Sequence, residues 1–112
     1  GGRAMTERLR NELTIERFEA ADIDPARFDH EAHVYVGWLY VMAYPRREAV
    51  ARFDAALRRL VEKVGAGDKY NAMITWLYLL LIAERAREGE DWPAFRARNA
   101  DLFDERPGSR AA

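Results

Sequence analysis

The 112-residue sequence predicts an all-α protein: a five-helix bundle with an up-down-up core in which two apolar helices flank an amphipathic one. Two observations carry this prediction. Residues 34–44 and 73–83 are almost entirely apolar, and between these segments apolar residues recur every three or four positions, as on one face of a helix. Short connections make consecutive helices antiparallel, so we expect the two apolar helices to run parallel at the centre.

The first helix is expected from Thr6, which suits the N-cap position, to Ala21. Asp24 and Pro25 then resemble an N-cap followed by proline at the first helical position, which predicts a new turn or helix there. The apolar stripe of the first helix consists of Leu9, Leu13, Phe18 and Ala21.

The segment 33–44 contains conflicting signals. Its β-branched and aromatic side chains favour a strand. However, it lacks alternation of polar and apolar residues, it is long for a strand, and no other segment offers a convincing pairing partner. We therefore expect a helix that opens at Asp29 and ends at Tyr44, before Pro45. A mixed fold with residues 34–44 as a strand is the alternative.

The remaining helices follow from amphipathic spacing and from turn residues. We expect the third from Arg46 to Val64, the fourth from Lys69 to Arg87, and a short fifth helix after the turn at 91–93. Gly65 and Gly67 should stop the third helix, and Asp68 should cap the fourth. Residues 1–5 are expected to be a tag remnant or disordered, residues 6–104 a single domain, and residues 105–112 a disordered tail.

The composition excludes several classes of protein. Eighteen Lys and Arg residues balance nineteen Asp and Glu residues, so no positive excess indicates binding to nucleic acid or an anionic membrane. Cysteine is absent, which excludes a disulfide framework and favours a reducing cytoplasm. The longest apolar run is too short for a bilayer. The abundance of Arg and Ala is typical of a bacterial coding bias. We expect a soluble, cytoplasmic, bacterial protein.

Two helices that are apolar almost all round are difficult to cover in so short a chain. Either the first and fifth helices wrap around them, or another molecule covers what is left. A homodimer or a helical protein partner would serve, and we expect a homodimer.

A candidate site lies where the two apolar helices begin. His30 and His33, the only histidines, are three residues apart and so share one helical face. If the apolar helices are parallel, their polar entrances meet at one end of the bundle. The helix N-termini there carry partial positive charge, so we expect the histidines to be largely neutral at pH 7. The residues predicted to line one pocket are His30, His33, Tyr70, Asn71 and Thr75.

Three roles are open for this site. The polar side chains could be purely structural, they could bind a small anionic or carboxylate-bearing ligand, or His30 and His33 could hold a divalent transition metal. Two histidines are too few for a closed zinc site, so Asp29, Glu31 or a distant carboxylate would have to join them. Gly37 costs a helix interior about 1 kcal/mol relative to Ala, which indicates close approach of a neighbouring helix or a ligand.

The segments 28–34 and 69–76 resemble an uncharacterised family of small bacterial all-helical proteins. The patterns of this family are Phe-x-His-x-x-His and Tyr-His-x-Thr-x-Thr, and the resemblance extends over about residues 28–103. Asn71 stands where the family pattern has a third histidine, and Met73 stands where it has a threonine. The resemblance implies no established activity, and the degenerate pattern implies that any metal site or proton transfer of the family is weakened here.

We therefore predict a small helical binding or interaction protein that is non-catalytic, with a polar pocket at the N-terminal ends of its two apolar helices. The alternative is a metal-dependent enzyme, or a degenerate relative or subunit of one, that uses His30 and His33. Whether the protein is an enzyme stays open, and no catalytic residue is assigned.

Overall fold

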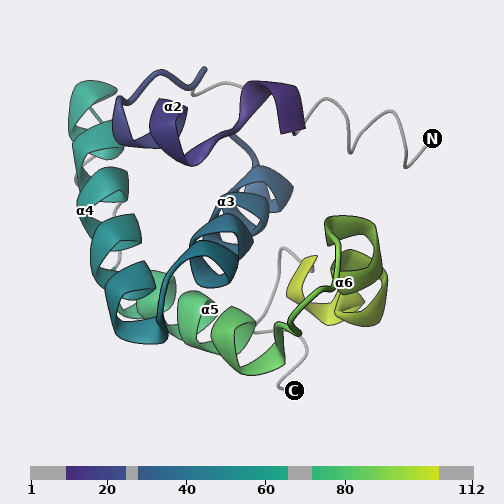
Figure 1. Cartoon of the computed structure of the whole chain (residues 1–112). Coiled ribbons are helices and arrows are strands. Elements are labelled where there is room, and N and C mark those ends of the chain that lie inside the picture. Colours follow the sequence, from purple (N-terminus) through teal and green to yellow (C-terminus); the bar gives the residue numbers. More distant parts are fainter. Residues whose placement is uncertain (1–9, 25–27, 66–71, 104–112) are drawn as a thin grey trace.

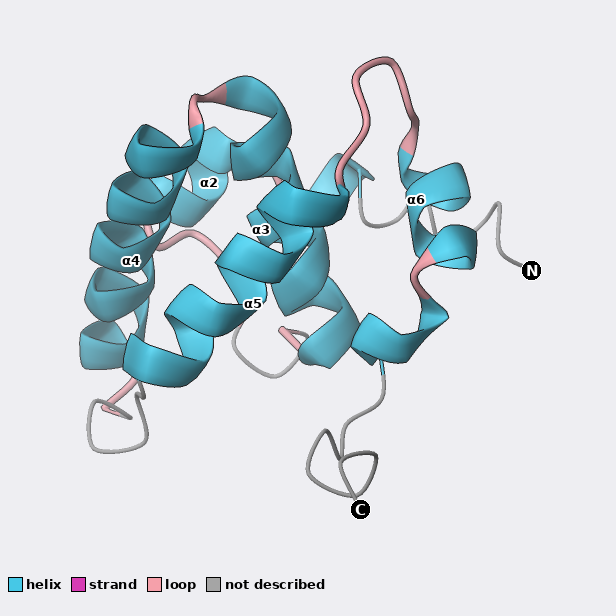
Figure 2. Ribbon diagram, turned by 90° about the horizontal axis from the view of Figure 1, so that it is seen from below, coloured by secondary structure: helices cyan, strands magenta, loops and turns pink. Residues whose placement is uncertain are grey.

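The computed structural model describes residues 10–24, 28–65 and 72–103, and throughout these ranges the regular structure is helical. The all-α prediction is confirmed, and the strand alternative for residues 34–44 is wrong. Helix α3 occupies the middle of the molecule, and α5 lies against its underside (Figures 1 and 2). The up-down-up arrangement itself stays a prediction. The elements are α2 (Ile15–Glu19), α3 (His30–Ala43), α4 (Arg46–Lys63), α5 (Ala72–Arg85), α6 (Trp92–Arg98) and the 3-10 helix η3 (Ala100–Phe103).

Helix α3 has the predicted bounds because both of its ends are set locally. The Asp29 side chain accepts a hydrogen bond from the backbone N–H of Ala32 at 2.9 Å, which caps the first turn. Tyr44 is already extended, and Pro45 follows it. Burial against neighbouring helices outweighs the β-propensity of this segment. The buried residues are Ala32, Val34, Tyr35, Val36, Gly37, Trp38 and Tyr40.

The expectation of one continuous first helix is wrong. Residues 10–12 are helical, the chain leaves the helix at Leu13 and Thr14, and α2 then begins at Ile15. Thr14 is the N-cap of α2, and its hydroxyl accepts a hydrogen bond from the backbone N–H of Arg17 at 3.1 Å. A threonine side chain that bonds the backbone in this way competes with a continuing helix. Thr6 and Pro25 lie outside the described residues.

Helix α4 confirms the amphipathic prediction. It ends near Gly65, whose φ of +73° is easily adopted by glycine. Its Arg59 and Lys63 side chains donate to the carbonyl oxygens of Glu19 and Ala21. Side chains of α4 therefore provide hydrogen-bond partners for backbone oxygens at the C-terminal end of α2. Its buried residues are Ala49, Val50, Phe53, Ala56, Leu57 and Leu60.

Helix α5 differs from its prediction at its C-terminal end and in its burial. The described helix ends at Arg85, and the predicted cap Asp68 lies outside the described residues. Leu79 and Ile82 are buried, but Trp76 and Leu77 on the other side are exposed. The prediction that both apolar helices occupy the centre is therefore correct for α3 and wrong for α5, because α5 packs against α3 and α4 on one side only. Among the described residues, no helix combines the length and apolar character needed to cross a membrane.

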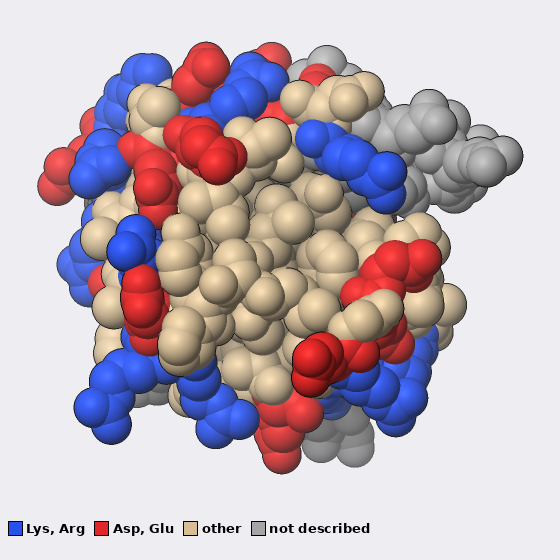
Figure 3. All heavy atoms as spheres, viewed as in Figure 1, with Lys and Arg blue, Asp and Glu red and all other residues tan. Residues whose placement is uncertain are grey.

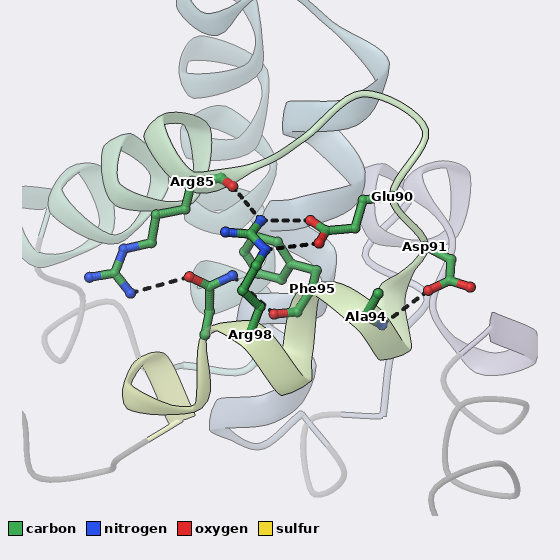
Figure 4. A network of polar contacts seen from close by, with 7 residues as sticks. Arg85, Glu90, Asp91, Ala94, Phe95 and Arg98 are labelled. Atoms are coloured by element: carbon green, nitrogen blue, oxygen red, sulfur yellow. Dashed lines mark hydrogen bonds and ion pairs between the residues drawn. The ribbon is translucent and has the colours of Figure 1, made fainter.

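The predicted fifth helix is present as α6. The Asp91 side chain caps it by accepting from the backbone N–H of Ala94 at 3.0 Å. The connection from α5 is held by Arg98, whose guanidinium donates to both carboxylate oxygens of Glu90 and to the backbone oxygen of Arg85 (Figure 4).

Aromatic packing attaches α6 to α3. The Trp92 ring lies 4.9 Å from that of Tyr35 and 5.4 Å from that of Trp38, measured between centroids. Trp38 also contacts Phe95. The buried indole N–H of Trp38 has no hydrogen-bond partner in the described part of the chain. Such an orphan donor costs about 1–3 kcal/mol, which the packing of these rings must offset.

Candidate functional site

A cavity of about 110 Å³ lies between α3, α4 and α5. Most of the surface of its wall is apolar. Polar side chains contribute to it from the first turns of α3 and from α5. The arrangement therefore combines an apolar body with a few hydrogen-bonding groups, as is typical of small-molecule sites. The lining residues are His30, His33, Val34, Gly37, Phe53, Thr75, Tyr78, Leu79 and Ile82.

Gly37 sets how closely α3 and α5 approach each other. A Cβ atom at this position would lie 3.2 Å from the Ile82 Cδ1 atom and 3.2 Å from the Leu79 Cδ2 atom, closer than ordinary contact. The sequence-based expectation of a close neighbour at Gly37 is confirmed, and the neighbour is α5. The absence of a side chain also leaves Gly37 as part of the cavity wall.

The His33 ring packs against two phenylalanine rings. Its centroid lies 5.5 Å from those of Phe28 and Phe53. Burial lowers the pKa of His33 to about 4, and the nearby His30 shifts this pKa in the same direction. His33 is therefore neutral at pH 7, as the sequence predicts, but burial is the main cause rather than the positive end of a helix.

His30 connects the cavity to the C-terminal part of the domain. Its Nε2 atom lies 2.7 Å from the backbone oxygen of Leu102 in η3. A carbonyl oxygen can only accept, so Nε2 carries the proton in this contact. The His30 ring also meets the Tyr78 ring edge-on, with the centroids 5.4 Å apart.

Of the five residues predicted to share a pocket, the structure brings His30, His33 and Thr75 to one cavity. Thr75 is buried, with 5 % of its surface exposed. Tyr70 and Asn71 lie outside the described residues.

Sequence reasoning did not assign the apolar part of the wall to the site. Phe53, Leu79 and Ile82 follow ordinary core spacing, which does not distinguish a residue that lines a cavity from one that fills the core. The Leu102 contact uses a backbone oxygen 72 positions from His30, so no side-chain pattern could indicate it.

The side chains offered as additional metal ligands have other partners. Asp29 caps α3, and Glu31 forms an ion pair with Arg96 at 3.1 Å. Within the described ranges, no group of three or more His, Cys, Asp or Glu side chains is placed to hold a metal ion. The metal site at His30 and His33 therefore gains no third ligand from this part of the chain.

The fold and the cavity together define a class: an all-α domain with a small, mostly apolar cavity that has polar groups in its wall. Comparison of the chain with protein-family models, with curated proteins and with solved structures finds no match. The resemblance to a family of small bacterial helical proteins stays a prediction.

Proposed function

We propose that this protein is a non-catalytic binding protein whose cavity takes one small neutral molecule with an apolar body and a single hydrogen-bonding group. The observation that carries this proposal is the composition of the cavity wall. Apolar surface contributed by three helices makes up most of it, and the polar groups in the wall include the Thr75 hydroxyl and the neutral His33 imidazole.

The electrostatics of the wall favour a neutral ligand over the small anionic ligand that the sequence left open. None of the described lining residues is Lys or Arg, and His33 is uncharged at pH 7. An anion enclosed here would lose its hydration and would find no Lys or Arg partner in the described lining, which is unfavourable. A phenol-like or alcohol-like group would need only one hydrogen bond.

The cavity volume limits the size of the ligand. An apolar cavity of about 150 Å³ accepts benzene, so about 110 Å³ corresponds to a molecule no larger than a single small ring. Catalysis gains little support from the same residues. A general base works best with a pKa near the working pH, whereas that of His33 is about 4.

The proposal is tested by NMR titration of the isotope-labelled protein with phenol and with benzene. We expect both probes to shift the amide signals of the lining residues, with phenol binding more tightly. Thr75→Val keeps the side-chain shape but removes the hydroxyl, so it should abolish the preference for phenol and leave benzene binding intact.

A second variant, Gly37→Ala, tests whether the probes bind in this cavity. The added methyl group would displace the ends of Leu79 and Ile82 into the cavity, so both probes should bind at least tenfold more weakly. Ala51→Ser, at an exposed position on α4, is the matched control and should bind like the wild type. No binding of either probe to the wild type at millimolar concentration would show that the proposal is wrong.

A further inference from the structure

Helix α5 carries an exposed apolar surface on the side opposite the cavity. Trp76, Leu77 and Leu80 have 47 %, 55 % and 41 % of their surface exposed. We name these three residues the α5 face. Leu80 lies one turn from both Trp76 and Leu77, so the three share one side of the helix. Exposed large apolar side chains that lie together, rather than singly, indicate an interaction surface.

The described structure does not cover the α5 face. Helices α3 and α4 pack on the other side of α5, and α6 packs through its aromatic residues against α3. Uncharged residues form a broad area that extends over α3 and α5, with charged residues at its margin (Figure 3).

We propose that the α5 face binds the same face of a second copy of this chain, with the two α5 helices antiparallel about a two-fold axis. Such an interface is self-complementary, since each contact occurs twice. With the axis passing between Leu77 and Leu80, Leu77 of each copy packs against Leu80 of the other.

The distribution of charge favours this occupant and this orientation. Residues 72–83 include no charged residue, so two copies can pair without burying a charge. Glu84 follows Leu80 by one turn on the same side and is exposed. In the antiparallel pair, each Glu84 lies level with residue 73 of the other copy and far from the other Glu84. A parallel pair would instead place the two Glu84 carboxylates side by side.

The size of the α5 face sets the strength of the dimer. Its three side chains expose roughly 300 Å² together, taking roughly 200 Å² as the full area of each side chain. A standard stable interface buries about 800 Å² on each partner. Because the α5 face is well below that size, we expect a weak, reversible dimer rather than an obligate one.

Sedimentation velocity between 1 and 500 μM tests the proposal. The wild type should change from monomer to dimer across this range. The double variant Leu77→Lys/Leu80→Lys should stay monomeric at 500 μM while keeping its helical circular dichroism, because both side chains are exposed. The matched control Ala51→Lys/Ala55→Lys, with two exposed positions on α4, should dimerise like the wild type.

Tryptophan fluorescence locates the interface independently. Trp38 and Trp92 are 9 % and 3 % exposed, so acrylamide should quench mainly Trp76. Quenching should fall at least twofold at 500 μM relative to 1 μM in the wild type and should not change in the Leu77→Lys/Leu80→Lys variant. A wild type that is monomeric at 500 μM overturns the proposal and leaves a helix of another protein as the occupant to consider. A dimer that survives in the double lysine variant also overturns it, because the contact then lies elsewhere.

Discussion

Helices α3 and α5 have the same length and almost the same apolar character, yet their surroundings differ. Each has 14 residues. Helix α3 packs against α2, α4, α5 and η3, and Val36 and Tyr40 are fully buried. Helix α5 leaves Leu77 more than half exposed. Apolar composition therefore indicates that a helix needs cover, but it does not say which sides the rest of the chain will cover.

The position of α6 explains the difference. Helix α6 could have covered either apolar helix, because it follows α5 through a short connection. Its aromatic residues pack against Tyr35 and Trp38 of α3 instead. Arg98 holds this connection by bonding both Glu90 and the end of α5. The side of α5 with Trp76 consequently stays uncovered by the described part of the chain.

The largest expected effect comes from a charge in the middle of α3. Val36→Asp would bury an unpaired carboxylate at a fully buried position. We expect a loss of more than about 4 kcal/mol in the free energy of unfolding, enough to unfold a domain of ordinary stability. Circular dichroism at 222 nm during urea unfolding measures this loss. A variant that unfolds at the wild-type urea concentration would contradict the central position of α3.

The start of α3 should make the stability depend on pH. His33 has a pKa of about 4 in the folded state and about 6.5 when unfolded, so the unfolded state binds more protons between these values. The free energy of unfolding should fall by about 3 kcal/mol as the pH decreases from 6.5 to 4, and His33 should contribute no further loss below pH 4. Urea unfolding at several pH values measures this slope.

Two substitutions identify the source of that pH dependence. His33→Gln removes the titrating ring and should remove this component of the slope, while the carboxylate contributions persist. His30→Gln should retain most of it. An equal slope in the wild type and in His33→Gln would show that the burial of His33 is not responsible.

A smaller effect is expected at the far end of α3. The Tyr40 hydroxyl donates to the Glu19 carboxylate at 3.1 Å, and burial is the main cause of the raised pKa of Tyr40. Tyr40→Phe keeps the ring and removes this bond, so we expect a loss of about 1 kcal/mol by urea unfolding. Tyr44→Phe, for which no comparable loss is expected, is the control. Equal stability of wild type and Tyr40→Phe would mean that the bond adds nothing net.

The smallest effect is expected on α5. Leu77→Asp places the same charge that unfolds α3 onto an exposed position. At 1 μM, where the chain is expected to be monomeric, the free energy of unfolding should change by less than about 0.5 kcal/mol. Differential scanning fluorimetry of Leu77→Asp and Val36→Asp under the same conditions compares the two losses of stability directly. A loss of several kcal/mol would show that α5 is covered within the monomer.

Local signals predicted much of the fold. Asp29 and Pro45 mark the two ends of α3 because a cap and a proline act on the neighbouring backbone alone. The break before α2 was not predicted, since the apolar stripe continues across Thr14, which is extended and caps α2 through its hydroxyl. The exposure of α5 depends on where α6 packs. That is a contact between helices, which the periodicity of apolar residues does not predict.

The candidate site shows the same division. The spacing of His30 and His33 predicts a shared face, and the cavity contains both. The phenylalanine rings around His33 come from Phe28 and from Phe53 of α4, so the extent of its burial, and hence its pKa, depends on a contact between helices. The sequence could therefore predict a neutral histidine but not the main reason for it.

The hydrogen bond between His30 and Leu102 also affects the order in which the protein can be completed during synthesis. Helices α3, α4 and α5 can emerge from the ribosome and pack while the C-terminal segment is still being made. The Nε2 atom of His30 has no access to its acceptor until residue 102 has followed. A nascent or truncated chain can thus form the apolar wall of the cavity before the orientation of His30 is fixed. The last element to emerge in the described domain completes a contact that begins at the first turn of α3.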